Sequence, residues 1–212
     1  MADDAAVAKT RETSAHRLIA FSDGVAAIAI TLLILPLTEI KVGPDTSLGQ
    51  VVVENGNALL AFALSFWVIA NYWTIHHGLF APVRHQNPRL IALNMLWLAA
   101  IVFLPFPTAL IADNVGGGFS TLYIGNLLIV SILSLVIAKY LARHPELTDS
   151  RETAESRNQF SQSAVVIAVL VAAGVVSIFF PRTGVLALLL LIPAQAIAGR
   201  LDARTSKKAT KL

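Results

Sequence analysis

Residues 17–37 read RLIAFSDGVAAIAITLLILPL, and this stretch decides the fold. Nearly all of its side chains are apolar, and its length matches the roughly 20 residues that a helix needs to cross the hydrocarbon core of a bilayer. Ser22 and Asp23 lie near its start, and Thr31 lies in its middle. Polar groups in a span otherwise suited to lipid require a structural or functional reason.

The composition places the whole chain among membrane proteins. Of its 212 residues, 56% are hydrophobic and 14% are charged, with a mean hydropathy of +0.69. In soluble domains, about a quarter of the residues are charged. The net charge of +3 suits an anionic membrane surface better than a nucleic acid. The absence of cysteine excludes disulfides, thiol nucleophiles and cysteine-ligated metal sites.

The apolar runs predict an all-α, polytopic membrane protein with six transmembrane helices. We place the spans at about 19–38, 56–76, 90–112, 119–141, 162–180 and 184–200. An alternative count of five makes the last two short runs a re-entrant hairpin. The chain then divides into a cytoplasmic N-terminal segment (1–18), a six-helix transmembrane domain (19–200) and a basic cytoplasmic tail (201–212). Residues 143–160 are expected to extend the fourth or fifth helix into solvent.

Basic residues predict the orientation of these spans, because cytoplasmic connections collect lysine and arginine. With both termini inside, the outer side keeps only Lys41 and Arg182, and every other lysine and arginine lies on the inner side. The inner set is Lys9, Arg11, Arg17, Arg84, Arg89, Lys139, Arg143, Arg151, Arg157, Arg200, Arg204, Lys207, Lys208 and Lys211. This bias strongly favours cytoplasmic termini.

Several polar residues of the first three spans are predicted to meet near the inner interface. At about 1.5 Å of rise per residue, Asp23, the pair His76 and His77, Asn94 and Trp97 all lie within about 8 Å of it. Ser22 and Asp23 can then form hydrogen bonds with an imidazole, amide or indole. The group is interpreted either as a polar clamp between helices or as a proton relay.

Other chemistry is not favoured by these residues. Adjacent histidines point about 100° apart on a helix and do not chelate a metal as residues four apart do. Neighbouring Ser22 and Asp23 do not by themselves form a hydrolytic triad. We expect no enzyme activity, no metal and no cofactor.

The first span has a second face. At about 100° per residue, Ile28, Thr31 and Leu35 share one stripe, and Asp23 lies about 220° around the helix from Ile28. From periodicity alone, this stripe can simply face lipid or pack, with Thr31 bonding its own i−4 carbonyl.

The run R-x-x-x-F-S-D (Arg17, Phe21, Ser22, Asp23) followed by GVAAIAITLLILPL resembles the signature of the transmembrane-protein-175 family. This family contains the lysosomal potassium channel and its bacterial six-helix relatives. The resemblance extends to WTIHH at the end of the second span and to the run from Asn94 to FLPFPT in the third, and it weakens through the last three spans.

The resemblance implies a homotetramer in which the first helix lines a central pore. It implies that Ile28 forms the main constriction, with Thr31 as a hydroxyl layer and Leu35 as an outer apolar ring. The R-x-x-x-F-S-D residues would then belong to a structural motif, supported by His77, Asn94 and Trp97. A single copy of the motif is typical of the bacterial members, which implies a bacterial plasma membrane.

The leading hypothesis is therefore a passive, potassium-preferring cation channel in the lipid bilayer, with K⁺ as the permeant ion and a hydrophobic gate. No TVGYG-like filter is present in the sequence. The alternatives are a proton-conducting or proton-coupled protein that uses Asp23 and His77, and a membrane scaffold that conducts nothing.

Overall fold

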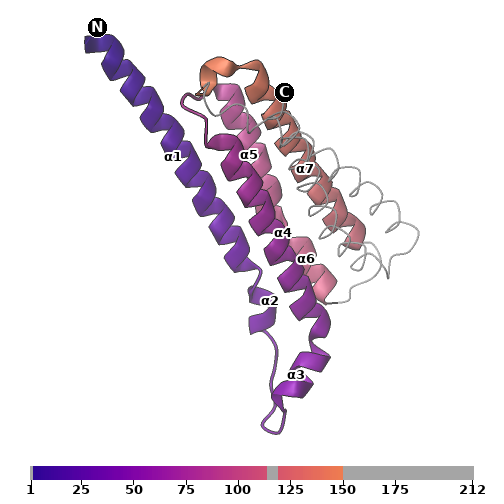
Figure 1. The fold of residues 1–212 in the computed structure, drawn as a ribbon. Helices are drawn as coiled ribbons and strands as arrows, with labels where there is room; N and C mark the ends of the chain where they lie inside the picture. Colours follow the sequence, from indigo (N-terminus) through magenta and orange to yellow (C-terminus); the bar gives the residue numbers. More distant parts are fainter. Residues whose placement is uncertain (1, 114–118, 150–212) are drawn as a thin grey trace, which may run out of the picture.

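The computed structural model describes residues 2–113 and 119–149, with side chains from residue 15 onward, and this part of the chain is almost entirely helical (Figure 1). Its elements are α1 (Ala2–Leu32), α2 (Leu35–Thr38), α3 (Leu48–Glu54), α4 (Gly56–Phe80), α5 (Pro88–Phe103), α6 (Pro105–Ala112), α7 (Phe119–Arg143) and the 3-10 helix η1 (Pro145–Leu147).

Four helical stretches in the described residues are long and apolar enough to cross a membrane. They are Ala15–Thr38, Gly56–Phe80, Pro88–Ala112 and Phe119–Arg143. Each agrees with one of the first four predicted spans to within about four residues, which confirms those spans. The fifth and sixth predicted spans and the basic tail lie outside the described residues.

The first span is interrupted near its C-terminal end. The N–H groups of Leu33 and Ile34 bond the carbonyls of Ile30 and Thr31, three residues back, at 3.3 Å each. Pro36, which opens the short helix α2, has no N–H to offer to the carbonyl of Leu32. The sequence treatment of this span as one regular helix through Leu35 is therefore wrong in its last turn.

The third span has a comparable break between α5 and α6, where Pro105 follows Leu104. The N–H of Leu104 bonds the carbonyl of Ile101, which leaves the carbonyl of Ala100 without its helical partner. Asn126 of α7 supplies the replacement, because its Nδ2 donates to Ala100 O at 2.8 Å. A buried asparagine thus stabilises a proline-induced break across the helix interface.

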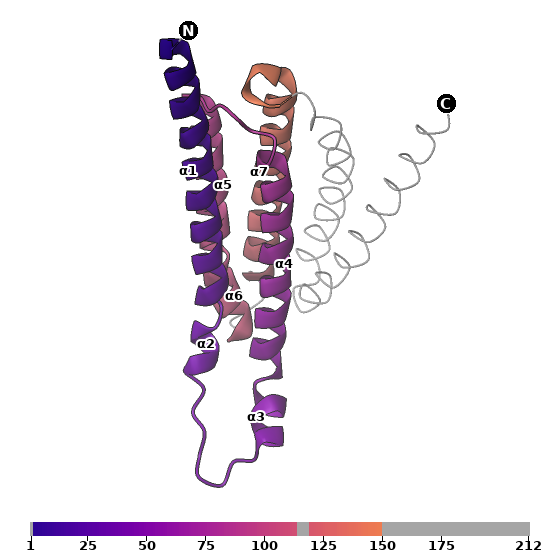
Figure 2. The same ribbon diagram turned by 60° about the vertical axis from the view of Figure 1, so that its left-hand side comes forward.

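The core lies between α4, α5, α6 and α7, which pack side by side (Figures 1 and 2). Its largest fully buried side chains include Trp97, Tyr123 and Phe80. Buried hydroxyls join the helices: Ser65 Oγ lies 2.8 Å from Thr108 Oγ1 and 3.0 Å from the Tyr123 hydroxyl. In a membrane, where helices gain little from hydrophobic burial against each other, such contacts contribute to association.

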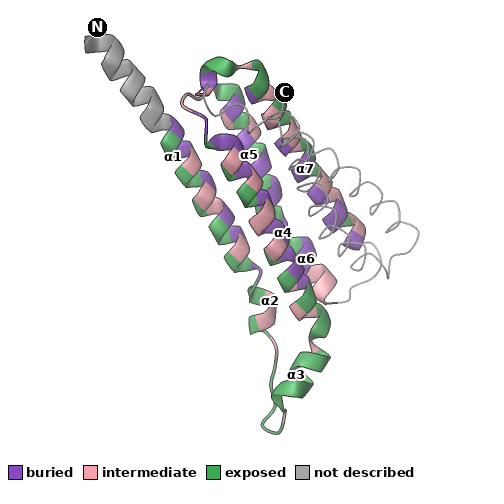
Figure 3. Cartoon of the chain, viewed as in Figure 1, coloured by how far each residue is buried: buried purple, intermediate pink, exposed green. Residues whose placement is uncertain are grey.

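Helix α1 packs on one side of this group, against α5 and α4 (Figure 2). It continues without interruption from Ala2, so the predicted boundary at residue 18 falls inside a helix. A buried stripe of small side chains faces the bundle, and Figure 3 shows buried and exposed residues alternating along α1 with the helical repeat. One face of α1 is therefore left uncovered by the described residues of the chain.

The end of α4, the start of α5 and the end of α7 are tied together by the segments that follow α4 and α7. Val83, between α4 and α5, forms an isolated antiparallel bridge with Thr148, which follows η1. Arg84 Nε lies 3.9 Å from Asp149 Oδ2 across the same contact. The sequence predicts that residues 143–160 extend the fourth or the fifth helix. An extension of the fourth is excluded, because α7 ends at Arg143 and the chain turns back through η1. An extension of the fifth lies outside the described residues.

Candidate functional site

The two faces of α1 differ in burial. Ser22, Ala26, Ala29 and Leu33 are between 0% and 2% exposed, and their spacing of four, three and four residues places them on one face. Small residues on this face allow α1 to approach α4 and α5 closely. Ile28 is 60% exposed on the other side of the helix.

The stripe predicted from the sequence is exposed in the single chain. Ile28 and Leu35 are 60% and 52% exposed, and Thr31 between them is also exposed. The structure therefore places all three outside the packed core. The break after Leu32 assigns Leu35 to α2, so its position relative to Ile28 is set by the turn at Leu33 and Ile34 as well as by the helical repeat.

The hydroxyl of Thr31 is bound to its own helix. Thr31 Oγ1 donates to the carbonyl of Ile28 at 2.8 Å, three residues back. With its hydrogen used in this bond, the oxygen still has lone-pair density for an incoming donor or cation. This orientation suits a group that replaces part of the hydration shell of an ion.

A hydrogen-bonded chain joins α4, α5 and α1. His76 Nε2 lies 2.7 Å from Asn94 Oδ1, and Asn94 Nδ2 donates to Ser22 Oγ at 2.9 Å. Ser22 Oγ in turn donates to the carbonyl of Leu18 at 2.9 Å. His76, Asn94 and Ser22 are 2%, 0% and 1% exposed, so the chain is buried.

Aromatic rings hold the imidazole of His76 in place. The ring of His76 stacks on Trp97 at 4.1 Å and on Phe80 at 4.3 Å between centroids. Trp97 donates its own Nε1 hydrogen to Ser134 Oγ of α7 at 2.9 Å. Trp97 thus supports the hydrogen-bonded chain by stacking on His76, and its indole N–H binds α7 instead of α1.

Asp23 belongs to a second, more exposed contact. Trp73 Nε1 donates to Asp23 Oδ1 at 2.8 Å, and His77 Nδ1 lies 3.8 Å from the same oxygen. The rings of Trp73 and His77 are tilted 37° to each other with centroids 5.5 Å apart. Both side chains come from one face of α4, because they lie four residues apart.

The structure brings only part of the predicted motif together. Ser22 and Asp23 contact α5 and α4, whereas Arg17 and Phe21 are exposed on α1. Sequence reasoning missed Trp73, and it grouped His77 with Asn94 and Trp97, where the structure has His76. The signal for Trp73 was its spacing of four from His77 at the end of the same span.

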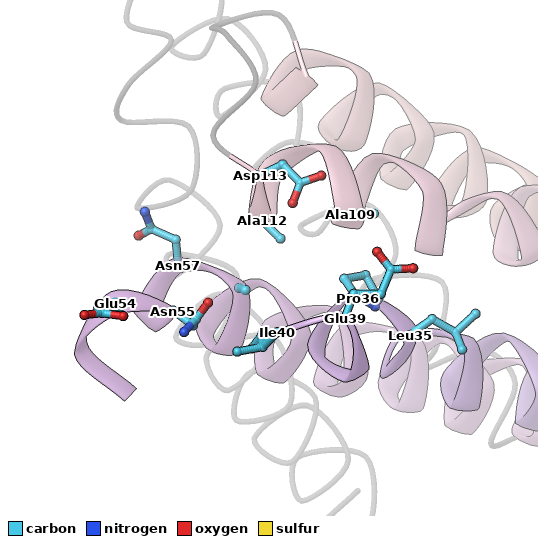
Figure 4. Close-up of a pocket in the computed structure, with 11 residues that line it drawn as sticks. Leu35, Pro36, Glu39, Ile40, Glu54, Asn55, Asn57, Ala109, Ala112 and Asp113 are labelled. Carbon is cyan, nitrogen blue, oxygen red and sulfur yellow. The ribbon is translucent and has the colours of Figure 1, made fainter. Parts of the chain in front are cut away.

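A pocket of about 530 Å³ lies at the end of the described bundle where α2, α3 and α6 are found. Leu35 and Pro36 line it, together with the carboxylate side chains of Glu39, Glu54 and Asp113. Figure 4 shows that these acidic residues come from different segments, after α2, at the end of α3 and after α6. The stripe of α1 and α2 therefore ends beside a cluster of negative charge.

Comparison with known protein families identifies the motif-bearing half of the chain. The family described as "Endosomal/lysosomal potassium channel TMEM175" matches residues 17–105, which begin at Arg17 and run through α5. Over this segment the chain is similar to the TMEM175 family. This confirms the resemblance read from R-x-x-x-F-S-D, including its decline after the third span.

Named relatives in the TMEM175 family are channels for different ions. A protein from Streptomyces collinus named a potassium channel is 39% identical over 97 residues, which cover 46% of this chain and 47% of that protein. The chicken "Endosomal/lysosomal proton channel TMEM175" is 28% identical over 167 residues, which cover 77% of this chain and 33% of that protein. The matched segments thus span about half or less of these relatives.

Solved structures in the TMEM175 family share the fold. The crystal structure of a lysosomal potassium-selective channel TMEM175 homologue from Chamaesiphon minutus matches with a TM-score of 0.62 and 29% identity, over 88% of this chain and 98% of that one. A TMEM175 potassium channel variant solved with a nanobody fusion matches with a TM-score of 0.59 at 18% identity, which shows the fold alone.

Proposed function

We propose that this protein is a potassium-preferring cation channel that conducts passively through the central pore of a homotetramer. Four copies of α1 surround the pore, and Ile28 forms its hydrophobic constriction. A single helix does not enclose a pore, so conduction requires a closed symmetric assembly. The protein carries out no enzymatic reaction, and K⁺ is a permeant ion rather than a cofactor.

The observation that carries this proposal is the exposed stripe of α1. Ile28 is 60% exposed although the opposite face of the same helix is almost fully buried. An apolar face in a membrane span also suits lipid, but the hydroxyl of Thr31 lies in the middle of this one. The bacterial relatives named as potassium channels favour the pore.

The proposed mechanism uses hydrophobic gating. A ring of four isoleucines gives too little hydration to an ion, so the pore conducts when the ring widens enough to admit water. The oxygens of Thr31 then replace part of the ion's water shell. The carboxylates of Glu39, Glu54 and Asp113 attract cations to the outer mouth.

The proposed architecture has six transmembrane helices with both termini in the cytoplasm, in the plasma membrane of a bacterium. Its basis is the sequence: two further apolar runs follow residue 149, and the lysine and arginine residues concentrate in the predicted inner segments. The lipid bilayer and other copies of the chain are the expected partners.

Flux in liposomes tests this function. Purified full-length protein should pass K⁺ down its gradient faster than Na⁺, without a proton gradient. A protein that passes neither cation under any gradient would be a scaffold, and the channel proposal would be wrong.

Removing the hydroxyl layer should weaken selectivity. In Thr31→Val, which keeps the shape of the side chain, we expect the K⁺/Na⁺ permeability ratio to fall by about fivefold or more, because the tetramer loses four oxygens and one hydrogen-bonding oxygen contributes about 1 kcal/mol. Reversal potentials under bi-ionic conditions measure this ratio. Thr38→Val is the matched control, since Thr38 also donates to its own helix, at Leu35 O, but lies beyond the stripe. Equal effects of the two changes would remove Thr31 from the selectivity layer.

A second candidate function is proton conduction. The animal relatives are named proton channels, and His77 Nδ1 lies 3.8 Å from Asp23 Oδ1. His76 instead favours a polar clamp between helices. Its hydrogen-bonded chain through Asn94 and Ser22 ends on the carbonyl of Leu18, which does not exchange protons.

The change Asp23→Asn separates these two functions. The amide oxygen can still accept from Trp73 Nε1, so we expect the tetramer to persist and K⁺ flux to stay within about twofold of the original value. Proton flux driven by a pH gradient, followed with a pH-sensitive dye, should be equally unaffected. Loss of proton flux from an intact tetramer would favour the second candidate.

A further inference from the structure

Helices α5 and α7 run antiparallel, with the start of α5 beside the end of α7. Asn87, Trp97 and the carbonyl of Ala100 on the α5 side bond Tyr140, Ser134 and Asn126 of α7 in reverse order, at 2.8, 2.9 and 2.8 Å. Figure 1 shows the same arrangement, in which the start of α5 and the end of α7 lie at one end of the bundle. The positive-inside bias assigns this end to the cytoplasm.

Helix α5 carries an exposed stripe that ends in an arginine. Arg89, Leu96 and Phe103 lie seven residues apart, about two helical turns, and therefore share one side of the helix. All three are exposed, Leu96 at 57% and Phe103 at 40%. Leu96 lies one turn from Ala100, which bonds α7, so the stripe borders the seam between the two helices.

Helix α7 carries a matching stripe. Ile129, Val136 and Arg143 also lie seven residues apart and are exposed, Ile129 at 52% and Val136 at 39%. Val136 lies one turn from Tyr140, which bonds Asn87 at the start of α5, so this stripe borders the same seam. Both stripes are apolar along the span and end in arginine at the same end of the bundle.

Arg89 and Arg143 each carry a positive charge that can attract an anion. Within residues 15–113 and 119–149, neither Arg89 nor Arg143 forms an ion pair, whereas nearby Arg84 lies 3.9 Å from Asp149. Arg89 is in the first turn of α5, where the helix dipole adds positive potential. Guanidinium groups bind phosphate oxygens with two parallel hydrogen bonds, which suits a phosphate between them.

We propose that the seam between α5 and α7 binds an anionic phospholipid. The lipid phosphate lies between Arg89 and Arg143, and an acyl chain lies along Leu96 and Val136. Charge complementarity at the arginine end, continuous with an apolar surface along the span, is the combination that a lipid molecule presents. This site depends on the membrane placement of the two helices and not on ion conduction.

Lipid retention by the purified full-length protein tests the site. Phosphatidylglycerol is the probe, titrated into the detergent-solubilised protein and counted by native mass spectrometry, with phosphatidylcholine as the zwitterionic comparison. We expect saturable binding of about one phosphatidylglycerol per chain, preferred about fivefold or more over phosphatidylcholine. The double variant Arg89→Gln/Arg143→Gln should lose this preference.

Two further variants distinguish a site from general attraction. Lys207→Gln/Lys208→Gln removes the same charge from the predicted cytoplasmic tail and should leave retention unchanged. Val136→Trp keeps both arginines but fills the apolar part of the seam, and it should reduce retention several-fold. If the tail variant loses as much phosphatidylglycerol as the arginine variant, the lipid is held by general attraction to positive charge. If both seam variants retain the lipid unchanged, the lipid binds elsewhere. A seam variant that changes oligomeric state at unchanged retention would make this surface a contact between copies. Each of these results would overturn the proposal.

Discussion

Replacing Ile28 by asparagine is expected to raise K⁺ flux by about tenfold or more and to reduce selectivity. The change converts a ring of apolar side chains into a ring of amides that hydrate an ion. Each 1.4 kcal/mol removed from the barrier at the constriction raises the rate about tenfold. The efflux of K⁺ from K⁺-loaded liposomes, normalised to the amount of reconstituted protein, measures the effect.

The control for this experiment is Ile132→Asn on α7. Ile132 is 43% exposed and receives the same substitution, but it lies on a helix that we do not place at the pore. Its flux should match that of the original protein. If both variants leak equally, the asparagine disrupts the bilayer seal in general. Unchanged flux in the Ile28 variant alone would remove the α1 stripe from the pore.

Replacing Asn94 by leucine is expected to cause the largest loss of stability. Asn94 is fully buried and joins His76 of α4 to Ser22 of α1. Leucine leaves the Nε2 of His76 without this acceptor, and a buried polar group without a partner costs about 1–3 kcal/mol. For a chain of this size, such a loss lowers the melting temperature by roughly 2–12 °C. Thermal unfolding in detergent measures this shift, and size-exclusion chromatography shows whether the assembly persists.

Asn71→Leu is the matched control. Asn71 is partly buried and donates to the carbonyl of Trp67 on its own helix at 2.7 Å, so its loss breaks no contact between helices. We expect its melting temperature to stay within about 2 °C of the original. If Asn94→Leu is equally mild, the hydrogen bonds between α1, α4 and α5 contribute little to stability.

The first four spans could be predicted because their hydropathy is a property of local sequence. The apolar runs around Ile28, Val68, Trp97 and Val130 are each long enough to cross a membrane, and the structure shows each as helix. Helix α3 was missed because it is short and lies outside these runs. Its signal was present, since Ser47 and Gln50 form a capping box at its start.

The breaks within the first and third spans are indicated by proline positions rather than by hydropathy. Pro36 and Pro105 lie inside apolar runs, so a window of hydropathy passes over them. Each removes a backbone donor, and the helix restarts at or just before it. The replacement partner of Ala100, Asn126 of α7, comes from a distant part of the chain, and no local pattern indicates it.

The polar cluster could be predicted only in outline. Helix rise placed Asp23, Asn94 and the histidine pair at one depth, and in the structure Asn94 contacts His76 and Asp23 lies beside His77. Depth alone did not determine which histidine faces which helix, because His76 and His77 differ by about 100° around α4. The faces of α4 are set by its packing against α1 and α6, so the assignment of His76 to Asn94 and of His77 to Asp23 requires the structure.

Accessibility of residue 28 to the aqueous pore is the most direct test of the central claim. The chain has no cysteine, so Ile28→Cys introduces a single thiol without further changes. A positively charged thiol reagent should reduce K⁺ flux through Ile28→Cys liposomes by at least about half, and the same treatment of Ile132→Cys should have no effect. If the reagent leaves the flux of a conducting Ile28→Cys protein unchanged, α1 does not line the pore.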